Sequence, residues 1–509
     1  MTHDATHSAY EKLKDRFRTI SNLGGAGSIL YMDGMTVMKP GSDSDRSEQM
    51  MALASAGHML LTDPVVRDWL DESESNATSL SPADQKNLYL MRRQWIAATA
   101  LPESLVREIA RLETEGNNMH TQYRASGNWA MMKPVYEQAF KTSREVGLIL
   151  KDALGFNTAY EALLDKFSPG LKLSTVETEF AKLESALPPM IAEAMERQKT
   201  QKKMKPLGSI PVEYHHAMAQ DLLRALGFDH DRGVFYTGDM HPLSGGTPDD
   251  SRLTTRYNPD HILDGLYTVM HETGHSLYEQ GSPRAWRYQP VGHTMGMDVH
   301  ESQSMILEYQ ACKIPEFIGY LSTLAHQHLP RKYRKGFTPD NLARHIFHVE
   351  PSFIRVAADE LTYPGHIILR YNIERAMVEG AMTIDDLPGA WNDAMKKTFN
   401  LTPPDASKGH MQDVHWPSLS AGYFPAYTLG AMGAAQFFAA AVKSNPSLPA
   451  EIGAGQFQTL KTWLNTNVHG HGSLLSQDQL FTTATGEPLN AAYYLNHLSR
   501  RYLGRDWQP

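Results

Sequence analysis

The chain has 509 residues, and 41% of them are hydrophobic, which is enough to build a large buried core. Its 48 basic and 57 acidic residues give a net charge of −9 at pH 7, which argues against nucleic acid or an anionic membrane surface as the main partner. Cys312 is the single cysteine, so the sequence excludes an intramolecular disulfide and favours a reducing compartment. With no signal-like N-terminus and no apolar run long enough to cross a bilayer, a cytoplasmic protein is expected.

The N-terminal part, residues 8–205, carries helix-forming residues almost throughout and predicts long antiparallel helices in an outer layer. Clusters of turn-forming residues predict breaks in these helices at residues 24–27, 39–45, 71–82 and 168–170. A basic run at residues 197–205 is interpreted as a solvated helix end or loop.

Two β-prone runs, residues 234–241 and 252–257, follow and flank a turn-forming segment, SGGTPDD. Because they come directly before the most distinctive helix of the chain, they predict a small sheet beside it. An exposed edge strand of that sheet is suited to hold an extended peptide through main-chain hydrogen bonds.

Residues 258–281 are the best marked helix of the sequence. Asn258 is expected to cap its N-terminus, Pro259 suits its first turn, and Gly281 marks its end. Leucine and methionine recur along one face at helical spacing. Gly274 and the threonine before it are small, which lets another backbone or a substrate approach this helix closely.

This helix carries an H-E-x-x-H motif made by His271, Glu272 and His275. Residues four apart project from one face of a helix, so both imidazoles can reach a single zinc ion. Glu272 is offset by one residue and is placed to hold and deprotonate a water beside the metal. The alternative is a pair of surface histidines that bind no metal.

A third ligand is expected from the next helix, where Glu301 lies 26 residues after His275. A carboxylate there completes a His2Glu catalytic site and leaves one position open for water. Two alternatives stand beside this prediction. Asp298 and Glu301 have capping-box spacing, so Glu301 could cap its own helix instead. Glu308, about two turns further on, is the other candidate ligand.

Two later segments are rich in polar and aromatic side chains. Residues 353–366 are predicted to place Arg355, Asp359 and Tyr363 on one helix, where Arg355 and Asp359 could form an ordinary surface ion pair. Residues 409–430 suit a structured loop and the start of a helix. Two further pairs of histidines, His215 with His216 and His469 with His471, are interpreted as ordinary surface residues.

Taken together, these residues resemble the thermostable carboxypeptidase family, also called carboxypeptidase Taq, of HExxH zinc metallopeptidases. The motifs that carry the resemblance occur in order along nearly the whole chain: LYMDGMTVMKPG at 30–41, HPLS at 241–244, DSRLTT at 250–255, HETGH at 271–275, HESQS at 300–304, IRVAADE at 354–360, GHMQDVHW at 409–416 and GYFPAYTLG at 422–430. Several motifs in the same order are far more specific than the zinc motif alone.

The resemblance implies a mainly α-helical, neurolysin-like fold with a deep substrate groove and a small β-sheet beside the zinc helix. It implies one catalytic domain over residues 1–509, with a helical outer layer over about 1–205 and the zinc and substrate motifs within about 234–430. The implied enzyme is a cytoplasmic homodimer that uses Zn²⁺, for which Co²⁺ can substitute. It removes single residues from peptides with a free C-terminus, with broad specificity and a poor acceptance of proline, by Glu-assisted attack of a zinc-bound water.

Matching the motifs position by position also assigns roles. His271, His275 and Glu301 correspond to the zinc ligands, which favours Glu301 over Glu308, and Glu272 corresponds to the general base. The remaining assignments are Arg355 for the terminal carboxylate of the substrate, Tyr423 and His415 near the scissile carbonyl, and His241, Asp250 and Arg252 as residues that shape the groove.

Three positions depart from the family pattern. Met305 stands where arginine usually follows HESQS, Met32 replaces a tryptophan, and Leu243 replaces the phenylalanine of the HPFS motif. Two other functions stay open on the sequence alone: a zinc oligopeptidase that cleaves within peptides, and a catalytically silent helical peptide-binding scaffold. Glu272 counts against the scaffold, because a scaffold needs no base beside a metal ligand.

Overall fold

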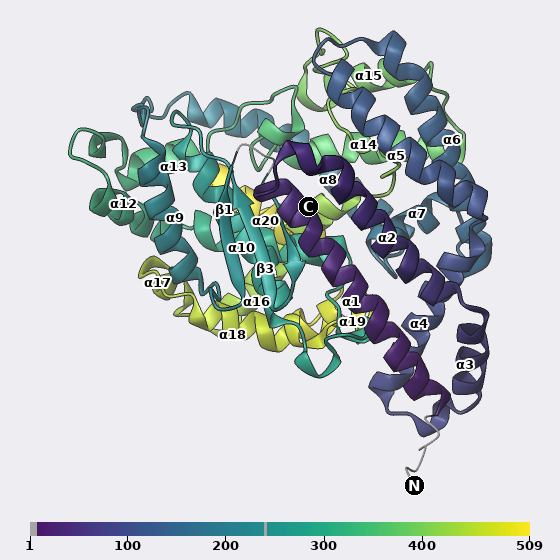
Figure 1. The fold of residues 1–509 in the computed structure, drawn as a ribbon. Helices are drawn as coiled ribbons and strands as arrows, with labels where there is room; N and C mark the ends of the chain where they lie inside the picture. The colour runs from purple at the N-terminus through teal and green to yellow at the C-terminus, as the bar shows by residue number, and fades with distance from the viewer. Residues whose placement is uncertain (1–7, 239–241, 509) are drawn as a thin grey trace.

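The computed structural model of the protein describes residues 8–238 and 242–508. It is mainly helical with a small β-sheet, as the sequence predicts (Figure 1). Within the described residues, no helix combines the length and the apolar character that crossing a bilayer requires. His241, which the sequence assigns to the substrate groove, lies outside the described residues.

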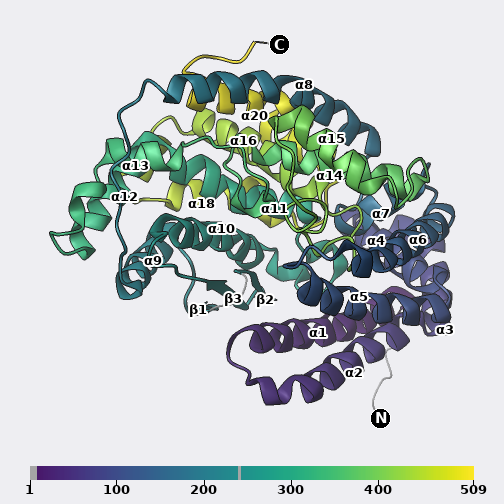
Figure 2. The ribbon, with the colours of Figure 1, turned by 90° about the horizontal axis from the view of Figure 1, so that it is seen from above.

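The first part of the chain is helical throughout. Its helices are α1 (Ala9–Thr36), α2 (Asp43–Thr62), α3 (Pro64–Ser75), α4 (Pro82–Ala100), α5 (Glu103–Tyr123), α6 (Trp129–Leu154), α7 (Ala159–Phe167) and α8 (Leu173–Gln198). Helices α1 and α2 form a long antiparallel hairpin, and α8 lies on the opposite side of the molecule (Figure 2). The basic run after α8 is exposed, in agreement with its interpretation as a solvated helix end.

The second part contains the sheet and the remaining helices. These elements are α9 (Val212–Leu226), β1 (Gly233–Thr237), β2 (Ser244–Thr247), β3 (Asp250–Thr255), α10 (Ile262–Gly281), α11 (Met297–Met305), α12 (Pro315–His328), α13 (Pro339–Ile346), α14 (Tyr363–Glu379), α15 (Leu387–Phe399), α16 (Pro425–Ser444), α17 (Leu448–Gly453), α18 (Gln458–Asn467), α19 (Gln477–Thr485) and α20 (Ala491–Leu498).

Most predicted helix breaks are confirmed, but the break at residues 24–27 is wrong, because α1 runs through these glycines without interruption. The lack of a side chain serves a packing purpose at Gly25, whereas, apart from the adjoining residues and backbone of α1, an added Cβ on Gly24 or Gly27 would meet no described atom within 4 Å. A Cβ on Gly25 would lie 3.2 Å from the Thr247 side chain on β2. The close contact between α1 and the sheet therefore outweighs the low helix propensity of glycine.

The sheet has the strand order β1-β3-β2, with β1 parallel and β2 antiparallel to the central strand β3. Strand β2 comes from the segment that the sequence marks as a turn, so this part of the prediction is wrong. Helix α1 supplies the reason, because it packs on β2. Gly246 donates its backbone N–H to the Ser28 hydroxyl at 3.0 Å, and fully buried Met32 packs against Gly245.

The core of the second part is a stack of three helices in which α11 lies between α10 and α16 (Figure 2). Glycines allow the backbones to touch. A Cβ on Gly274 of α10 would lie 2.2 Å from the carbonyl oxygen of Gln303. On the other side, a Cβ on Gly430 of α16 would lie 2.5 Å from the Cβ of Glu301. Helix α11 is thus held at backbone distance from both neighbours, as the small residues of the α10 sequence suggest.

Two predicted helix positions need correction. Helix α10 begins at Ile262, because the Asn258 side chain accepts from the backbone N–H of Asp260 at 3.0 Å and forms a turn instead of a cap. Arg355 lies in a 3-10 turn, η8 (Arg355–Ala357), and α14 begins only at Tyr363. The two elements are separate because the Asp359 carboxylate accepts the backbone N–H groups of Leu361 and Thr362, which form a turn before α14.

Two of the four histidines interpreted as surface residues are buried. His215 is fully buried, and its Nε2 lies 3.1 Å from the carbonyl oxygen of Ile210. His469 is 1% exposed, and its Nε2 lies 3.0 Å from the amide oxygen of Gln303. Both rings therefore serve packing and local hydrogen bonding.

We predict that Gly274→Ala destabilises the protein by about 1–3 kcal/mol, because the added methyl group forces α10 and α11 apart. Chemical denaturation measures this change. The matched control is Gly319→Ala in α12, where, apart from the adjoining residues and backbone of its own helix, no described atom lies within 4 Å of the added Cβ. Alanine there should leave the stability unchanged or raise it by up to about 1 kcal/mol. Equal stability of both variants would contradict the packing argument.

Candidate metal centre

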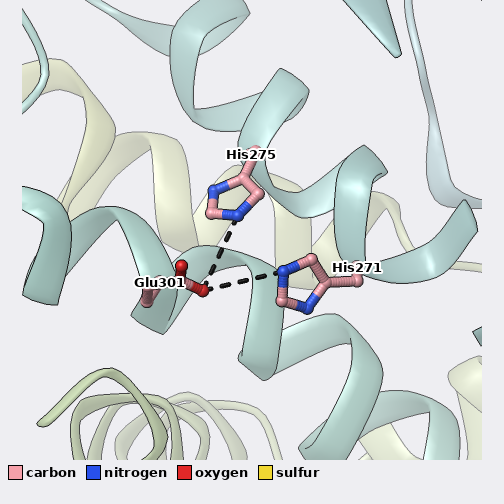
Figure 3. A group of neighbouring side chains, drawn as sticks. All are labelled: His271, His275 and Glu301. Carbon is pink, nitrogen blue, oxygen red and sulfur yellow. Dashed lines mark ion pairs between the residues drawn. The ribbon is translucent and has the colours of Figure 1, made fainter. Parts of the chain in front are cut away.

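Three side chains from two helices converge on one point in the middle of the helical stack (Figure 3). The Nε2 atoms of His271 and His275 lie 3.6 and 3.7 Å from Oε2 of Glu301. The possible ligand atoms of the three residues all lie within 4.8 Å of one another. Ligand atoms around a tetrahedral metal ion with bonds near 2.1 Å are about 3.4 Å apart, so the spacing fits a divalent ion.

The remaining ring nitrogens of both histidines are hydrogen-bonded outside this point. Nδ1 of His271 lies 2.8 Å from Oε2 of Glu308, and Nδ1 of His275 lies 2.6 Å from Nδ1 of His300. A proton on Nδ1 satisfies these contacts and leaves the lone pair of Nε2 free to face Glu301. The donor set is therefore arranged for metal binding. The third donor, Glu301, is buried, with 4% of its surface exposed.

The structure separates the two candidate carboxylates. Glu301 faces the inner nitrogens of both histidines, whereas Glu308 contacts only the outer nitrogen of His271 among these atoms. Glu308 lies in a π-helical turn, η5 (Ile306–Gln310), which directly follows α11. The capping-box alternative is wrong, because α11 begins after Gly296 without a side-chain cap. Glu301 therefore lies inside the centre and Glu308 behind it.

Glu272 lies on α10 between the two histidines and is 6% exposed. Burial raises the pKa of Glu272 to about 7, against the opposing effects of charge on His271 and of a hydrogen bond with the Ser244 side chain. The contact with Ser244 places Glu272 next to strand β2. A proton acceptor therefore lies between the metal centre and an edge of the sheet.

A second charged cluster surrounds Asp413, in the loop before α16. Arg355 donates to Oδ1 of Asp413 from Nε at 3.0 Å and from Nη2 at 2.8 Å, and it donates from Nη1 to the Tyr363 hydroxyl at 2.8 Å. Arg370 donates to the other oxygen of Asp413 at 2.7 Å. The alternative of a surface ion pair between Arg355 and Asp359 is thus wrong, because Asp413 binds Arg355 instead. Two arginines share one carboxylate, so this buried cluster carries one unbalanced positive charge.

An aromatic wall connects this cluster to the metal centre. The ring centroids of Tyr423 and His415 are 5.5 Å apart, those of Tyr423 and Tyr427 are 5.3 Å apart, and those of Tyr427 and Tyr363 are 6.1 Å apart. Tyr427 lies one turn before Gly430 on α16, the residue that packs against Glu301. Burial, together with the charge on Arg355, lowers the pKa of His415 to about 3, so this ring is neutral.

Asp250 and Arg252 lie on β3 and bind each other through two contacts of 3.0 and 2.9 Å. They alternate along the strand with buried Ser251 and Leu253. These contacts do not test the assignment of Asp250 and Arg252 to the substrate groove, which stays a prediction. The sequence did not single out Tyr427, Arg370, Asp413 or His300 as site residues. Tyr427, Asp413 and His300 lie inside recognised motifs and only Arg370 lies outside them, but their partners include residues from distant parts of the chain.

Two of the three departures from the family pattern, Met305 and Met32, have packing partners, and the third, Leu243, is held through its backbone. Met305 is 2% exposed and lies in the main hydrophobic core, so an apolar side chain suits the position. Met32 fills the space against Gly245 between α1 and β2. Leu243 donates its backbone N–H to the Thr254 hydroxyl at 3.0 Å.

Comparisons with known proteins agree over nearly the whole chain. The sequence pattern of the carboxypeptidase Taq (M32) metallopeptidase family matches residues 12–502. Thermostable carboxypeptidase 1 of Thermus thermophilus is 32% identical over 97% of this chain and 98% of its own, and carboxypeptidase 1 of Bacillus subtilis is 29% identical with the same coverage. Among solved structures, metallocarboxypeptidase 1 of Trypanosoma cruzi superimposes with a TM-score of 0.94 at 32% identity, covering 97% of this chain and 99% of that chain. The M32 carboxypeptidase of Deinococcus radiodurans gives 0.91 at 30% identity, covering 97% and 98%.

We predict that Glu301→Gln weakens zinc binding by more than about 100-fold, because a neutral amide is a poor zinc ligand. Glu308→Gln should weaken it by only about 10- to 100-fold, since Glu308 supports His271 without facing the ion. Competition with a chromophoric chelator measures both dissociation constants. If Glu308→Gln weakened zinc binding more than Glu301→Gln, Glu308 would be the ligand and Glu301 the supporting residue.

Proposed function

Because the chain belongs to the carboxypeptidase Taq (M32) metallopeptidase family and is a metallocarboxypeptidase, we propose that it uses zinc to release single C-terminal amino acids from peptides. Zinc is proposed to be held by His271, His275 and Glu301. The observation that carries the proposal is the convergence of the three inner ligand atoms with Glu272 beside them and a net positive cluster nearby. Cobalt, which accepts the same donor atoms, is expected to substitute.

When bound, the ion supplies Lewis acidity, which lowers the pKa of a water and polarises the scissile carbonyl. Glu272 accepts the proton of the attacking water and then gives it to the departing amine. Its position one residue from a ligand keeps its carboxylate close to the reacting atoms. Its low exposure keeps that carboxylate from being solvated by bulk water.

Arg355 is proposed to bind the terminal carboxylate of the substrate. Three of its five N–H donors are engaged by described residues, Asp413 and Tyr363, so two remain for a ligand. The second arginine on Asp413 matters here, because Arg370 neutralises Asp413 and leaves the charge of Arg355 unbalanced. A carboxylate that enters beside Arg355 supplies the missing negative charge, in a setting where charge-assisted hydrogen bonds are strong.

The tetrahedral oxyanion is proposed to receive hydrogen bonds from the aromatic wall. Tyr423 is the first candidate donor, and neutral His415 packs against its ring. A donor placed for the transition state contributes on the order of 3 kcal/mol. Burial raises the pKa of the Tyr423 hydroxyl, so the phenol keeps its proton and acts as a donor.

Further parts of the proposal concern specificity and assembly. We expect broad specificity with proline disfavoured, and a deep groove shaped in part by His241, Asp250 and Arg252. Residues 1–509 are proposed to act as one catalytic domain. The main hydrophobic core extends from Leu105 to Leu503, and a second, smaller core joins α1, α3 and α4. A cytoplasmic homodimer is expected, and the single cysteine, which is buried and unpaired, supports a reducing compartment.

The test compares one unblocked peptide with its C-terminally amidated twin. We predict at least about 10-fold lower kcat/KM for the amide, because it lacks the anion whose charged hydrogen bonds contribute roughly 1.5–3 kcal/mol. Chelation should abolish both reactions, and zinc should restore them. Glu272→Gln is the matched variant, expected to keep the metal and to lose at least about 100-fold in kcat. Equal cleavage of both peptides would identify an oligopeptidase, and activity without metal would refute the mechanism.

We predict that Arg355→Lys lowers kcat/KM on unblocked peptides by at least about 10-fold, or roughly 1.4 kcal/mol, and has little effect on amidated peptides. Lysine keeps a charge but lacks the planar fork. Arg370→Lys is the comparison, because Arg370 binds the same Asp413 and is fully buried. It should reduce activity on both peptides by a similar factor. The same response in both variants would assign Arg355 a structural role only.

A further inference from the structure

A chain of hydrogen bonds extends outward from His275. Its Nδ1 lies 2.6 Å from Nδ1 of His300, and Nε2 of His300 lies 3.1 Å from Oε1 of Glu279. Thr294 donates its hydroxyl to the same oxygen of Glu279 at 2.9 Å. His300 lies directly before Glu301 in sequence, and Glu279 lies one turn after His275 on α10. These hydrogen bonds therefore join α10, α11 and the loop between the two helices.

These contacts allow a single arrangement of protons when His275 uses Nε2 as a ligand. His275 must then carry its proton on Nδ1 and donate it to His300. His300 accepts through Nδ1, so its own proton stands on Nε2 and is donated to Glu279. A carboxylate at the end accepts from both His300 and Thr294.

The two histidines of the metal centre are thus supported in different ways. His271 donates directly to the carboxylate of Glu308 at 2.8 Å. His275 donates to a neutral imidazole, and the carboxylate stands one residue further out. The ring of His300 is 15% exposed and packs on Tyr278 with centroids 5.2 Å apart, so packing as well as Glu279 fixes its orientation.

We propose that His300 and Glu279 are positioning residues that select the tautomer of His275 and thereby set the metal affinity of the centre. This inference rests on the proposed ligand set. Neither residue needs to touch the ion or the substrate. An acceptor at position 300 holds the proton of His275 on Nδ1, and Glu279 keeps His300 in the tautomer that can accept.

The experiment measures the zinc dissociation constant of the metal-free protein by chelator competition. His300→Phe retains a planar ring but offers no acceptor, so we expect about 10- to 100-fold weaker binding. His300→Asn places its side-chain oxygen near the position of Nδ1, and the loss should stay below about 10-fold. Glu279→Ala should also weaken binding. The double variant His300→Phe/Glu279→Ala should bind no more weakly than His300→Phe alone, because both changes break one chain.

His469→Asn is the matched control. His469 also packs on Tyr278, with centroids 5.1 Å apart, but binds Gln303 and Asn465 instead of a ligand. The zinc dissociation constant of the His469→Asn variant should equal that of the wild type. Thermal unfolding of the metal-free proteins separates positioning from misfolding, and Glu279→Ala carries the test if His300→Phe does not fold.

The inference is overturned if His300→Phe and His300→Asn bind zinc equally well or equally poorly, or if the losses of the double variant add. These results would leave the proposed function intact, provided that the wild type binds zinc and cleaves peptides. Failure of the wild type to bind zinc would instead refute the proposed function.

Discussion

The structure depends on the backbone contact between α10 and α11 at Gly274. A side chain at this position would collide with the carbonyl oxygen of Gln303, so glycine sets the distance between the two helices. Gly430 of α16 imposes the same limit from the other side, directly behind Glu301. Dense packing of this kind resists small displacements, because protein cores have few voids into which a helix can move. The carboxylate of Glu301 is therefore held within reach of both imidazoles.

Buried charges hold the second half of the site in a similar way. Glu374 on α14 accepts from the Tyr160 hydroxyl, from Nε1 of Trp416 at 2.9 Å and from the backbone N–H of Gly422 at 3.2 Å. Burial raises the pKa of Glu374 to about 7. These bonds tie the loop before α16 to α14 and α7. The loop carries Asp413 and Tyr423. Glu374, which has no proposed part in the reaction, therefore orients residues that are proposed to take part in it.

Features that depend on neighbouring residues could be predicted from the sequence, whereas contacts between distant segments could not. The mainly helical fold, the small sheet and the helix that carries His271 and His275 follow from spacing and composition, because these patterns are local. Glu301 and Arg355 were singled out by motifs, and the structure places Glu301 with the two histidines.

The failures concern interactions between distant segments. Glycines at 24–27 look like a break until β2 is seen to pack against α1, and the turn-like β2 becomes a strand for the same reason. Local spacing offers Asp359, four residues away, as an ion-pair partner for Arg355, but Asp413 binds Arg355 from a separate loop. His300 lies beside a predicted ligand, yet its function depends on Glu279, which belongs to another helix. No local pattern encodes these partners.

The central claim is that one ion binds between α10 and α11 through these three side chains. A crystal structure of the zinc-loaded protein, with anomalous data collected on both sides of the zinc absorption edge, tests it most directly. We predict one strong peak about 2.0–2.2 Å from Nε2 of His271, Nε2 of His275 and a carboxylate oxygen of Glu301. A peak coordinated by Glu308 in place of Glu301, or a peak elsewhere in the molecule with this centre empty, would contradict the account.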